Sequence, residues 1–320
     1  MTFARILGHE RQKDLLRRAL KSDRLANAYL FTGPDGIGKR LVALALARAV
    51  FCPAQGCGDC PACRKIDHGN HPDLHILEAD GANIKIEQIR LLQKELAYRA
   101  LEASRKICLI EAADKLNRSS GNALLKTLEE PPGNAIFILL TAHPQRVLQT
   151  IRSRCQPLPF NRLAAVQLED ELRVQLDLND EESHILAALS EGSFKKALGR
   201  DRDLYLNERR ELIQSLVMLS SGSILPIFAL AERLAADKDR LPEVLEIYQA
   251  FYRDALLRRH DGAAQFINID LRANIETVAG KHSTLELLNK LVAIKETRHR
   301  LERNVNRQLA METLLLQLVA

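Results

Sequence analysis

The chain has 320 residues, 46% of them hydrophobic, so it exceeds the size at which a single core usually stops growing. Aromatic residues make up only 4% and Trp is absent, which argues against a base-stacking platform for single strands. The formal charge of +5 permits contact with DNA phosphates without requiring it. The apolar run Leu41–Phe51 is too short to span a bilayer, and we expect a cytoplasmic protein with no signal peptide.

The first half of the chain alternates between short apolar runs and helical patterns. The predicted strands end at Phe31 or cover Asp73–Leu77, Ile107–Ile110 and Ile136–Leu140. The predicted helices cover Arg40–Val50, Ile86–Arg99 and Asn122–Glu130, the last of them stopped by Pro131 and Pro132. Continuous apolar strands that alternate with helices are typical of a parallel α/β sheet.

The second half of the chain carries helical patterns only, after a predicted linker marked by Pro157 and Pro159. We predict an α/β domain over 1–160, a small helical domain over 161–202 and an all-helical domain over 203–320. Near the end of the chain, an apolar stripe at helical spacing is formed by Leu301, Val305, Leu309, Leu316 and Val319.

Residues 33–39 have the G-x-x-x-x-G-K spacing of a P-loop, between a predicted strand and a predicted helix. In such loops, glycines like Gly33, Gly36 and Gly38 let successive backbone N–H groups point at phosphate oxygens, and Lys39 adds a positive charge. The next residue should be Ser or Thr, whose hydroxyl binds Mg²⁺. Here it is Arg40, which cannot ligate a metal ion.

The strand Ile107–Ile110 leads into Glu111 and Ala112, where a Walker B site would lie. Active ATPases of this kind usually end the strand with Asp-Glu, because the first carboxylate orders Mg²⁺ and the second polarises the attacking water. Ala112 cannot act as a base. Together with Arg40, it predicts that ATP hydrolysis at this site is absent or negligible, while binding of ATP or ADP stays open.

Four cysteines lie within twelve residues, at Cys52, Cys57, Cys60 and Cys63. Four thiolates satisfy tetrahedral Zn²⁺, and gaps of two residues let neighbouring sulfurs converge on one ion, so we predict a structural zinc site. Buried free cysteines, a redox pair and an iron–sulfur cluster remain as alternatives. Spare metal ligands nearby are His68, His71 and His75.

Several segments together resemble the AAA+ subunits of the bacterial DNA polymerase III clamp loader. They are residues 27–31 leading into the P-loop, the cysteine cluster, Asn122–Pro132, Ser153-Arg154-Cys155 and Asn306–Glu312. The resemblance spans nearly the whole chain and implies an α/β P-loop (AAA+) domain, a small helical lid domain and a helical collar domain. Arg40, Glu111 and Ala112 point to the delta-prime type of subunit, whose nucleotide site is degraded, rather than to the gamma/tau motor.

The resemblance also implies roles for single residues. In such rings the arginine of Ser-Arg-Cys reaches the neighbouring subunit's ATP site, so Arg154 becomes the expected arginine finger, acting in trans. Thr141 matches the sensor position after the strand Ile136–Leu140. Lys195 stands where motor subunits usually carry a second sensor arginine, and lysine lacks the planar fork of arginine.

The resemblance finally implies partners. They are the gamma/tau and delta subunits and, through the assembled complex, the sliding clamp and primer–template DNA. Arg90 and Arg146 are candidates for sequence-independent contacts with DNA phosphates, or else solvated surface residues. We expect no enzyme activity from the chain alone, which would be a component of the DNA polymerase III holoenzyme.

Two alternatives stay open. An ATP-hydrolysing motor would turn over Mg-ATP alone and lose that activity on Lys39→Ala. A zinc-dependent nucleic-acid-binding module would bind DNA tightly alone and release it on chelation.

Overall fold

The structure is a computed structural model that describes the chain apart from residues 1, 200, 221, 261–264, 304 and 320. It divides into two compact units. The first consists of Met1–Gln167 with Ser193–Lys195, and the second of Leu168–Gly192 with Lys196–Ala320. This division does not test the predicted boundaries of the three domains, which stay a prediction. Among the helices of the described residues, none is long and apolar enough to cross a membrane.

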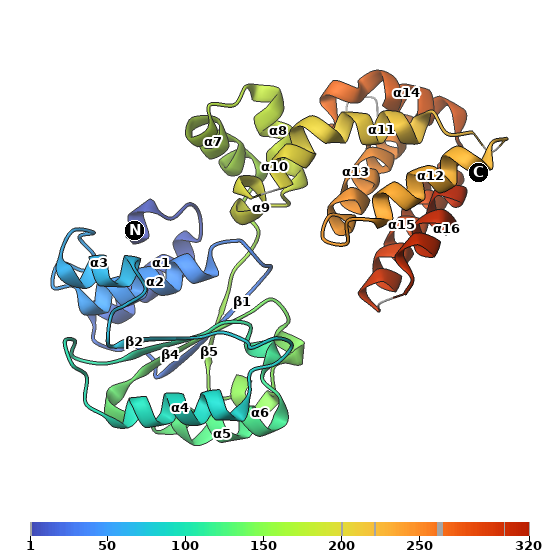
Figure 1. Ribbon diagram of the computed structural model, residues 1–320. Coiled ribbons are helices and arrows are strands. Elements are labelled where there is room, and N and C mark those ends of the chain that lie inside the picture. The colour runs from blue at the N-terminus through green and yellow to red at the C-terminus, as the bar shows by residue number, and fades with distance from the viewer. Residues whose placement is uncertain (1, 200, 221, 261–264, 304, 320) are drawn as a thin grey trace. The chain divides into compact units, whose positions relative to one another are not determined.

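The first unit is built on a sheet of parallel strands, as predicted (Figure 1). The strands are β1 Ala28–Thr32, β2 Leu74–Leu77, β3 Ile107–Ile110, β4 Ile136–Thr141 and β5 Gln156–Pro159. Their order across the sheet is β2-β3-β4-β1-β5. Ligands of parallel α/β sheets bind beyond the carboxyl ends of the strands, so the loops after β1, β3 and β4 lie at the functional edge.

Helices cover both faces of this sheet (Figure 1). One face carries α1 Glu10–Lys21, α2 Lys39–Phe51 and α3 Pro61–Asp67, and the other carries α4 Ile86–Ala97, α5 Arg118–Glu129 and α6 Gln149–Arg152. Successive residues of a strand point to opposite faces. Accordingly, Tyr29 and Phe31 pack in the core on the side of α2, while Leu30 packs in the core of the opposite face. Burial on both sides explains why the strands are continuously apolar.

The predicted linker at Pro157 and Pro159 is wrong, because this segment forms β5 and pairs with β1. β5 lies at the edge of the sheet, where strands tolerate proline because one side of the backbone has no neighbour. Helix α5 also begins earlier than predicted, at Arg118, because the side chain of Asn117 accepts a hydrogen bond from the backbone N–H of Ser120 and caps it.

Among its described residues the second unit contains helices and no strand, as predicted. Its helices are α8 Asp180–Leu189, α10 Asp201–Asp203, α11 Arg209–Val217, α12 Ile224–Ala235, α13 Leu241–His260, α14 Arg272–Lys281, α15 Thr284–Glu302 and α16 Arg307–Val319; α7 Ala165–Leu176 and α9 Phe194–Leu198 each begin in the first unit. α13 packs against α14 and α15, and α16 packs against α12 and α15.

The predicted C-terminal apolar stripe is not the face that α16 buries in its own domain. Leu309 is 60% exposed, and Val305 and Leu316 are each 42% exposed. The buried face of α16 consists of Ala310, Met311, Leu314, Leu315 and Leu318. The helix is therefore apolar on two sides, and one of them faces solvent in the single chain.

Candidate functional site

The P-loop connects the end of β1 to the start of α2, as the motif predicts. Its three glycines, Gly33, Gly36 and Gly38, have φ angles of 143°, 74° and 105°. These values lie in the region that favours glycine. At Gly33, a Cβ atom would also lie 2.2 Å from the carbonyl oxygen of Phe160, so a side chain has no room there. The loop geometry that a phosphate cradle needs is present.

The segment Ser193–Lys195 packs directly on this loop, within the first unit. The backbone N–H of Lys195 donates a hydrogen bond to the carbonyl oxygen of Gly36 at 3.3 Å. A Cβ atom on Gly36 would lie 2.2 Å from the hydroxyl oxygen of Ser193. The structure thus brings Lys195 to the P-loop, although its assignment as a sensor stays a prediction.

Lys39 is the first residue of α2 and is only 7% exposed. Its ammonium group donates hydrogen bonds to the carbonyl oxygens of Gly33 and Pro34, at 2.5 and 2.6 Å. Burial lowers the pKa of Lys39, and the carboxylate of Asp35, 3.7 Å away, opposes that shift. The lysine is therefore held inside the loop that it would serve in binding phosphate.

Arg40 and Glu111 form an ion pair across the site. The Nε atom of Arg40 donates to Oε1 of Glu111 at 2.5 Å, although the two residues are 71 positions apart. Arg40 is the second residue of α2, next to Lys39, and Glu111 directly follows β3. The two positions that would hold Mg²⁺ in an active ATPase here hold each other.

Ala112 follows Glu111 in a left-handed conformation, with φ of 51° and ψ of 54°. Left-handed backbone is uncommon for residues other than glycine and requires support from the surrounding structure. The methyl side chain offers neither a base for water nor a ligand for a metal ion. Hydrolysis is therefore not supported by this position.

Asp114 is a second carboxylate in the site, and no role is assigned to it in the sequence analysis. The hydroxyl of Thr141, at the end of β4, donates to its Oδ1 at 2.5 Å, and the backbone N–H of His143 donates to Thr141 at 2.9 Å. Asp114 also acts electrostatically on Lys39, whose pKa it raises against the effect of burial. The sequence signal that could have identified Asp114 is its place three residues after Glu111, beyond the buried strand β3.

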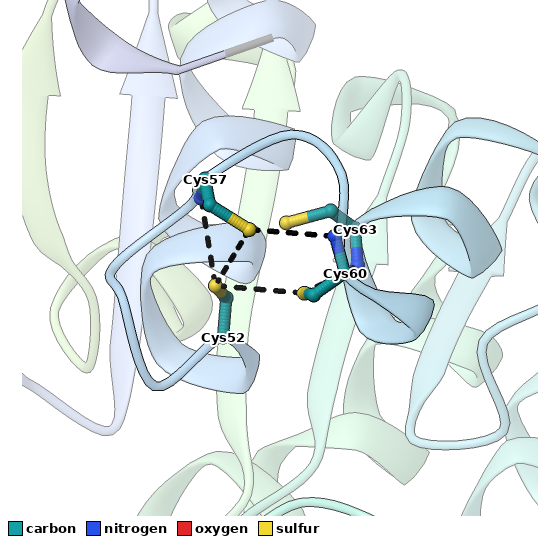
Figure 2. Close-up of side chains that lie close together, drawn as sticks. All are labelled: Cys52, Cys57, Cys60 and Cys63. Carbon is teal, nitrogen blue, oxygen red and sulfur yellow. Dashed lines mark hydrogen bonds between the residues drawn. The ribbon is translucent and has the colours of Figure 1, made fainter.

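The four cysteines of the cluster turn their sulfurs toward one another, as Figure 2 shows. All four Sγ atoms lie within 4.8 Å of one another, and Cys52 is 3.6 Å from both Cys57 and Cys60. Zn–S bonds of about 2.3 Å in a tetrahedron place sulfurs roughly 3.8 Å apart. The spacing of the thiols thus fits a tetrahedral metal ion, and the cluster could hold one.

Backbone N–H groups contact three of the four sulfurs of the cysteine cluster. Cys52 ends α2, and Cys60 caps the N-terminus of α3. Backbone N–H groups of Cys57, Cys60 and Cys63 donate to the sulfurs of Cys52, Cys57 and Cys60, at 3.4–3.5 Å. Although burial raises the pKa of the Cys52 thiol, the N–H groups of residues 54, 56 and 57 and the thiol of Cys60 outweigh it and lower the pKa to about 6, whereas burial raises the pKa of Cys63 to about 12. Thiolates are the form that binds metal.

The three nearby histidines do not join this group of possible ligands among the described residues. His68 contacts the carbonyl oxygen of Arg64 at 2.7 Å. His71 stacks on Phe51, with ring centroids 4.3 Å apart. His75 lies 2.9 Å from a carboxylate oxygen of Glu95. The four thiols are thus the group that could hold a metal ion, without these histidines.

Arg154 lies just after α6 and is about one third exposed. Its Nε donates to Oε1 of Glu129 at 2.5 Å, its Nη2 pairs with the same oxygen, and its Nη1 donates to the carbonyl oxygen of Thr150 at 2.9 Å. The guanidinium is thus held by its own chain while part of it faces solvent. The neighbouring Cys155 is buried, which raises its pKa to about 12 and makes it unreactive.

The two candidates for DNA contact are exposed. Arg90 lies on α4, and Arg146 ends the short 3₁₀ helix Pro144–Arg146. Exposure alone does not distinguish a phosphate contact from a solvated side chain, so both assignments stay predictions.

Comparison with known proteins places the chain among replication proteins. A family model described as "DNA polymerase III, delta subunit" matches residues 8–164. A second model, described as "DNA polymerase III, delta subunit, C terminal", matches residues 204–319. The two models together cover both the sheet-containing part and the C-terminal helices.

Full-length relatives agree with these models. The chain is 34% identical to "DNA polymerase III subunit delta'" of Bacillus subtilis, over 95% of this chain and 94% of the relative. It is 33% identical to the subunit of the same name from Pseudomonas aeruginosa, over 91% of each chain. Its 39% identity with "DNA polymerase III subunit tau" of Escherichia coli covers 62% of this chain but only 32% of the relative.

A solved structure agrees on the fold. The crystal structure of a DNA polymerase III, gamma subunit-related protein from Thermotoga maritima has a TM-score of 0.50, at 20% identity, and covers 96% of this chain and 98% of its own.

Proposed function

The chain belongs to the family of DNA polymerase III delta' subunits, and we propose that in the clamp loader it hydrolyses no ATP itself but completes the ATPase site of a neighbouring subunit. Arg154 would supply an arginine finger in trans. Such a finger stabilises the charge that develops on the γ-phosphate, and it raises the rate by about 10³–10⁵-fold in other phosphoryl-transfer systems.

The observation that carries this proposal is the presentation of Arg154. Its guanidinium is one third exposed and uses one N–H on Thr150 and two on Glu129. Because arginine has five N–H donors, two remain for a phosphate. A chain with Ala112 at the place of a catalytic carboxylate thus still offers one group suited to phosphoryl transfer.

The cysteine cluster would hold a structural zinc ion. Four thiolates form a closed ligand set with no open position for water or substrate, so the ion would serve the fold rather than a reaction. The predicted cytoplasmic location, where free thiols stay reduced, is part of the same proposal.

The C-terminal helices would join the chain to the gamma/tau and delta subunits in a collar. Support comes from apolar side chains that the second unit leaves exposed on α12, α15 and α16, among them Leu225 at 81%, Leu285 at 67% and Leu309 at 60%. Large exposed apolar patches usually mark interaction surfaces. The sliding clamp and primer–template DNA would be met through the assembled complex, with Arg90 and Arg146 as the phosphate contacts of this chain.

The test of the finger uses Arg154→Ala, with Arg152→Ala, at the last residue of α6, as a matched control. Both variants should assemble with the partner subunits. The DNA-stimulated ATPase of the complex should then fall with Arg154→Ala alone, through a loss of roughly 10³-fold at the one site that Arg154 serves. An unchanged ATPase in a fully assembled Arg154→Ala complex would refute the finger.

A further inference from the structure

Arg40 and Glu111 meet at the two positions that hold the divalent cation in an active P-loop ATPase. One position normally supplies a Ser or Thr hydroxyl and the other a carboxylate, and Mg²⁺ lies between them. Here the Nε of Arg40 reaches Oε1 of Glu111 at 2.5 Å. A guanidinium has only donors, so it cannot ligate a cation. The carboxylate of Glu111, which would ligate the cation, is instead paired with Arg40.

We propose that this ion pair replaces the divalent cation, so that the P-loop takes a nucleoside polyphosphate without a metal ion. The inference rests on the nucleotide site of the proposed function, but not on the finger Arg154. Mg²⁺ normally bridges and neutralises the phosphates. In this chain Arg40 would neutralise the phosphates instead, because its planar guanidinium matches the geometry of phosphate oxygens.

The rest of the cradle supports phosphate binding. Gly33, Gly36 and Gly38 all have positive φ angles, the backbone geometry that turns successive N–H groups to one side. Lys39 is buried and donates to two carbonyl oxygens of the loop itself. Phosphate oxygens compete well for such an ammonium, because hydrogen bonds between charged groups are stronger than those to neutral carbonyls.

The charges at the site favour a diphosphate over a triphosphate. A metal ion would contribute two positive charges, whereas Arg40 contributes one, and Glu111 partly cancels it at 2.5 Å. Asp114 adds a negative charge that acts on Lys39. With less positive charge available, the added charge of a γ-phosphate is less well compensated. ADP should therefore bind more tightly than ATP.

The experiment is equilibrium binding of ADP and ATP to the full chain, with and without Mg²⁺. Metal-free conditions must come from treated buffers rather than a chelator, which would also strip the cysteine cluster. The unaltered chain should bind ADP with affinities that agree within about twofold in the two conditions, because Arg40 offers Mg²⁺ no ligand and Glu111 is paired with Arg40. Affinity that rises tenfold or more with Mg²⁺, or no binding of either nucleotide at millimolar concentration, would overturn the proposal.

Two variants should change nucleotide binding in different ways. Arg40→Thr restores the metal-binding hydroxyl and frees Glu111, so binding should become dependent on Mg²⁺, by roughly tenfold. Glu111→Gln frees Arg40 and should strengthen metal-free ADP binding by about twofold to fivefold, the range of a partly exposed ion pair. If Glu111 held a metal ion, Glu111→Gln would instead weaken binding in Mg²⁺. Failure of these tests leaves the finger at Arg154 untouched, because Arg154→Ala is assayed in the assembled complex.

Discussion

The two ends of helix α2 carry sites in opposite condition. At its start, Lys39 and Arg40 belong to a phosphate cradle whose metal-binding hydroxyl and catalytic carboxylate are replaced. At its end, Cys52 belongs to a group of four thiols with the spacing of a complete tetrahedral site. One helix thus joins a P-loop that lacks two groups of an active ATPase to a group of four thiols whose spacing fits a tetrahedral metal ion.

The difference teaches how much each kind of site reveals in sequence. The complete site is local, since its four cysteines lie within twelve residues and their backbone N–H groups support the sulfurs. The altered site depends on Arg40 and Glu111, which are 71 residues apart and meet only in the fold. The grouping of the cysteines can be predicted from their spacing in the sequence. The pairing of Arg40 with Glu111 can be recognised only from the distance between them in the structure.

Loss of a metal ligand should have the largest effect of the substitutions that probe this comparison. Cys60→Ser removes one thiolate but keeps a good N-cap for α3, because serine is among the preferred capping residues. If the four thiols hold zinc, the bound metal should be lost together with about 3 kcal/mol of stability, given that metal binding couples to folding. The melting temperature of the first unit should fall by roughly 6–12 °C. Zinc content and thermal unfolding measure the two effects.

His68→Gln is the matched control for that experiment. His68 lies close to the cluster in sequence, but it contacts the carbonyl oxygen of Arg64 and is not among the grouped ligands. This variant should keep one metal ion per chain. A full complement of zinc in Cys60→Ser, or its loss in His68→Gln, would show that the ligand set is not the four thiols.

The fold class could be predicted because strands such as Ile136–Thr141 are buried on both faces and therefore continuously apolar. The edge strand β5 was missed because Pro157 and Pro159 are typical of linkers, and only the position at the edge makes them compatible with pairing. Helix α1, Glu10–Lys21, was missed because charged residues dominate its sequence. Local composition is a poor guide where the position of a segment in the sheet decides whether it forms a strand.

The partners of the site residues could not be predicted for a related reason. Arg154 pairs with Glu129, 25 residues earlier, and Thr141 pairs with Asp114, 27 residues earlier. The sequence marked Arg154 and Thr141 through a family resemblance that says nothing of the groups that hold them. Such partners become visible only when α5, α6 and β4 are placed in space.

Glu129→Gln should have an intermediate effect and tests whether the chain, despite its altered nucleotide site, holds Arg154 in a fixed direction. Glu129 accepts from both Nε and Nη2 of Arg154, which fixes the direction of the guanidinium. Both side chains are partly exposed, so the pair contributes less than about 1 kcal/mol. If Arg154 acts in trans, the DNA-stimulated ATPase of the complex should fall by about twofold to fivefold in kcat, with KM for ATP unchanged.

Glu130→Gln, one residue further, is the control, and it should leave kcat unchanged. A purely structural role of Glu129 would appear in assembly or thermal stability and not in kcat. Equal kcat values for Glu129→Gln and the unaltered chain would show that the ion pair does not prepare Arg154.

Ala112→Gly should have the smallest effect. It tests whether catalysis still constrains residue 112 of the altered nucleotide site. Ala112 has φ of 51°, a conformation that costs a residue with a Cβ roughly 1 kcal/mol more than glycine. Glycine also loses more entropy on folding, which offsets part of that gain, so the net stabilisation should be about 0.5 kcal/mol. The melting temperature of the isolated chain should rise by about 1–2 °C. The DNA-stimulated ATPase of the complex should stay unchanged, because a methyl group takes no part in handling water. A lower ATPase in this variant would show that residue 112 still serves the reaction, and the contrast between the two ends of α2 would then be weaker than the geometry indicates.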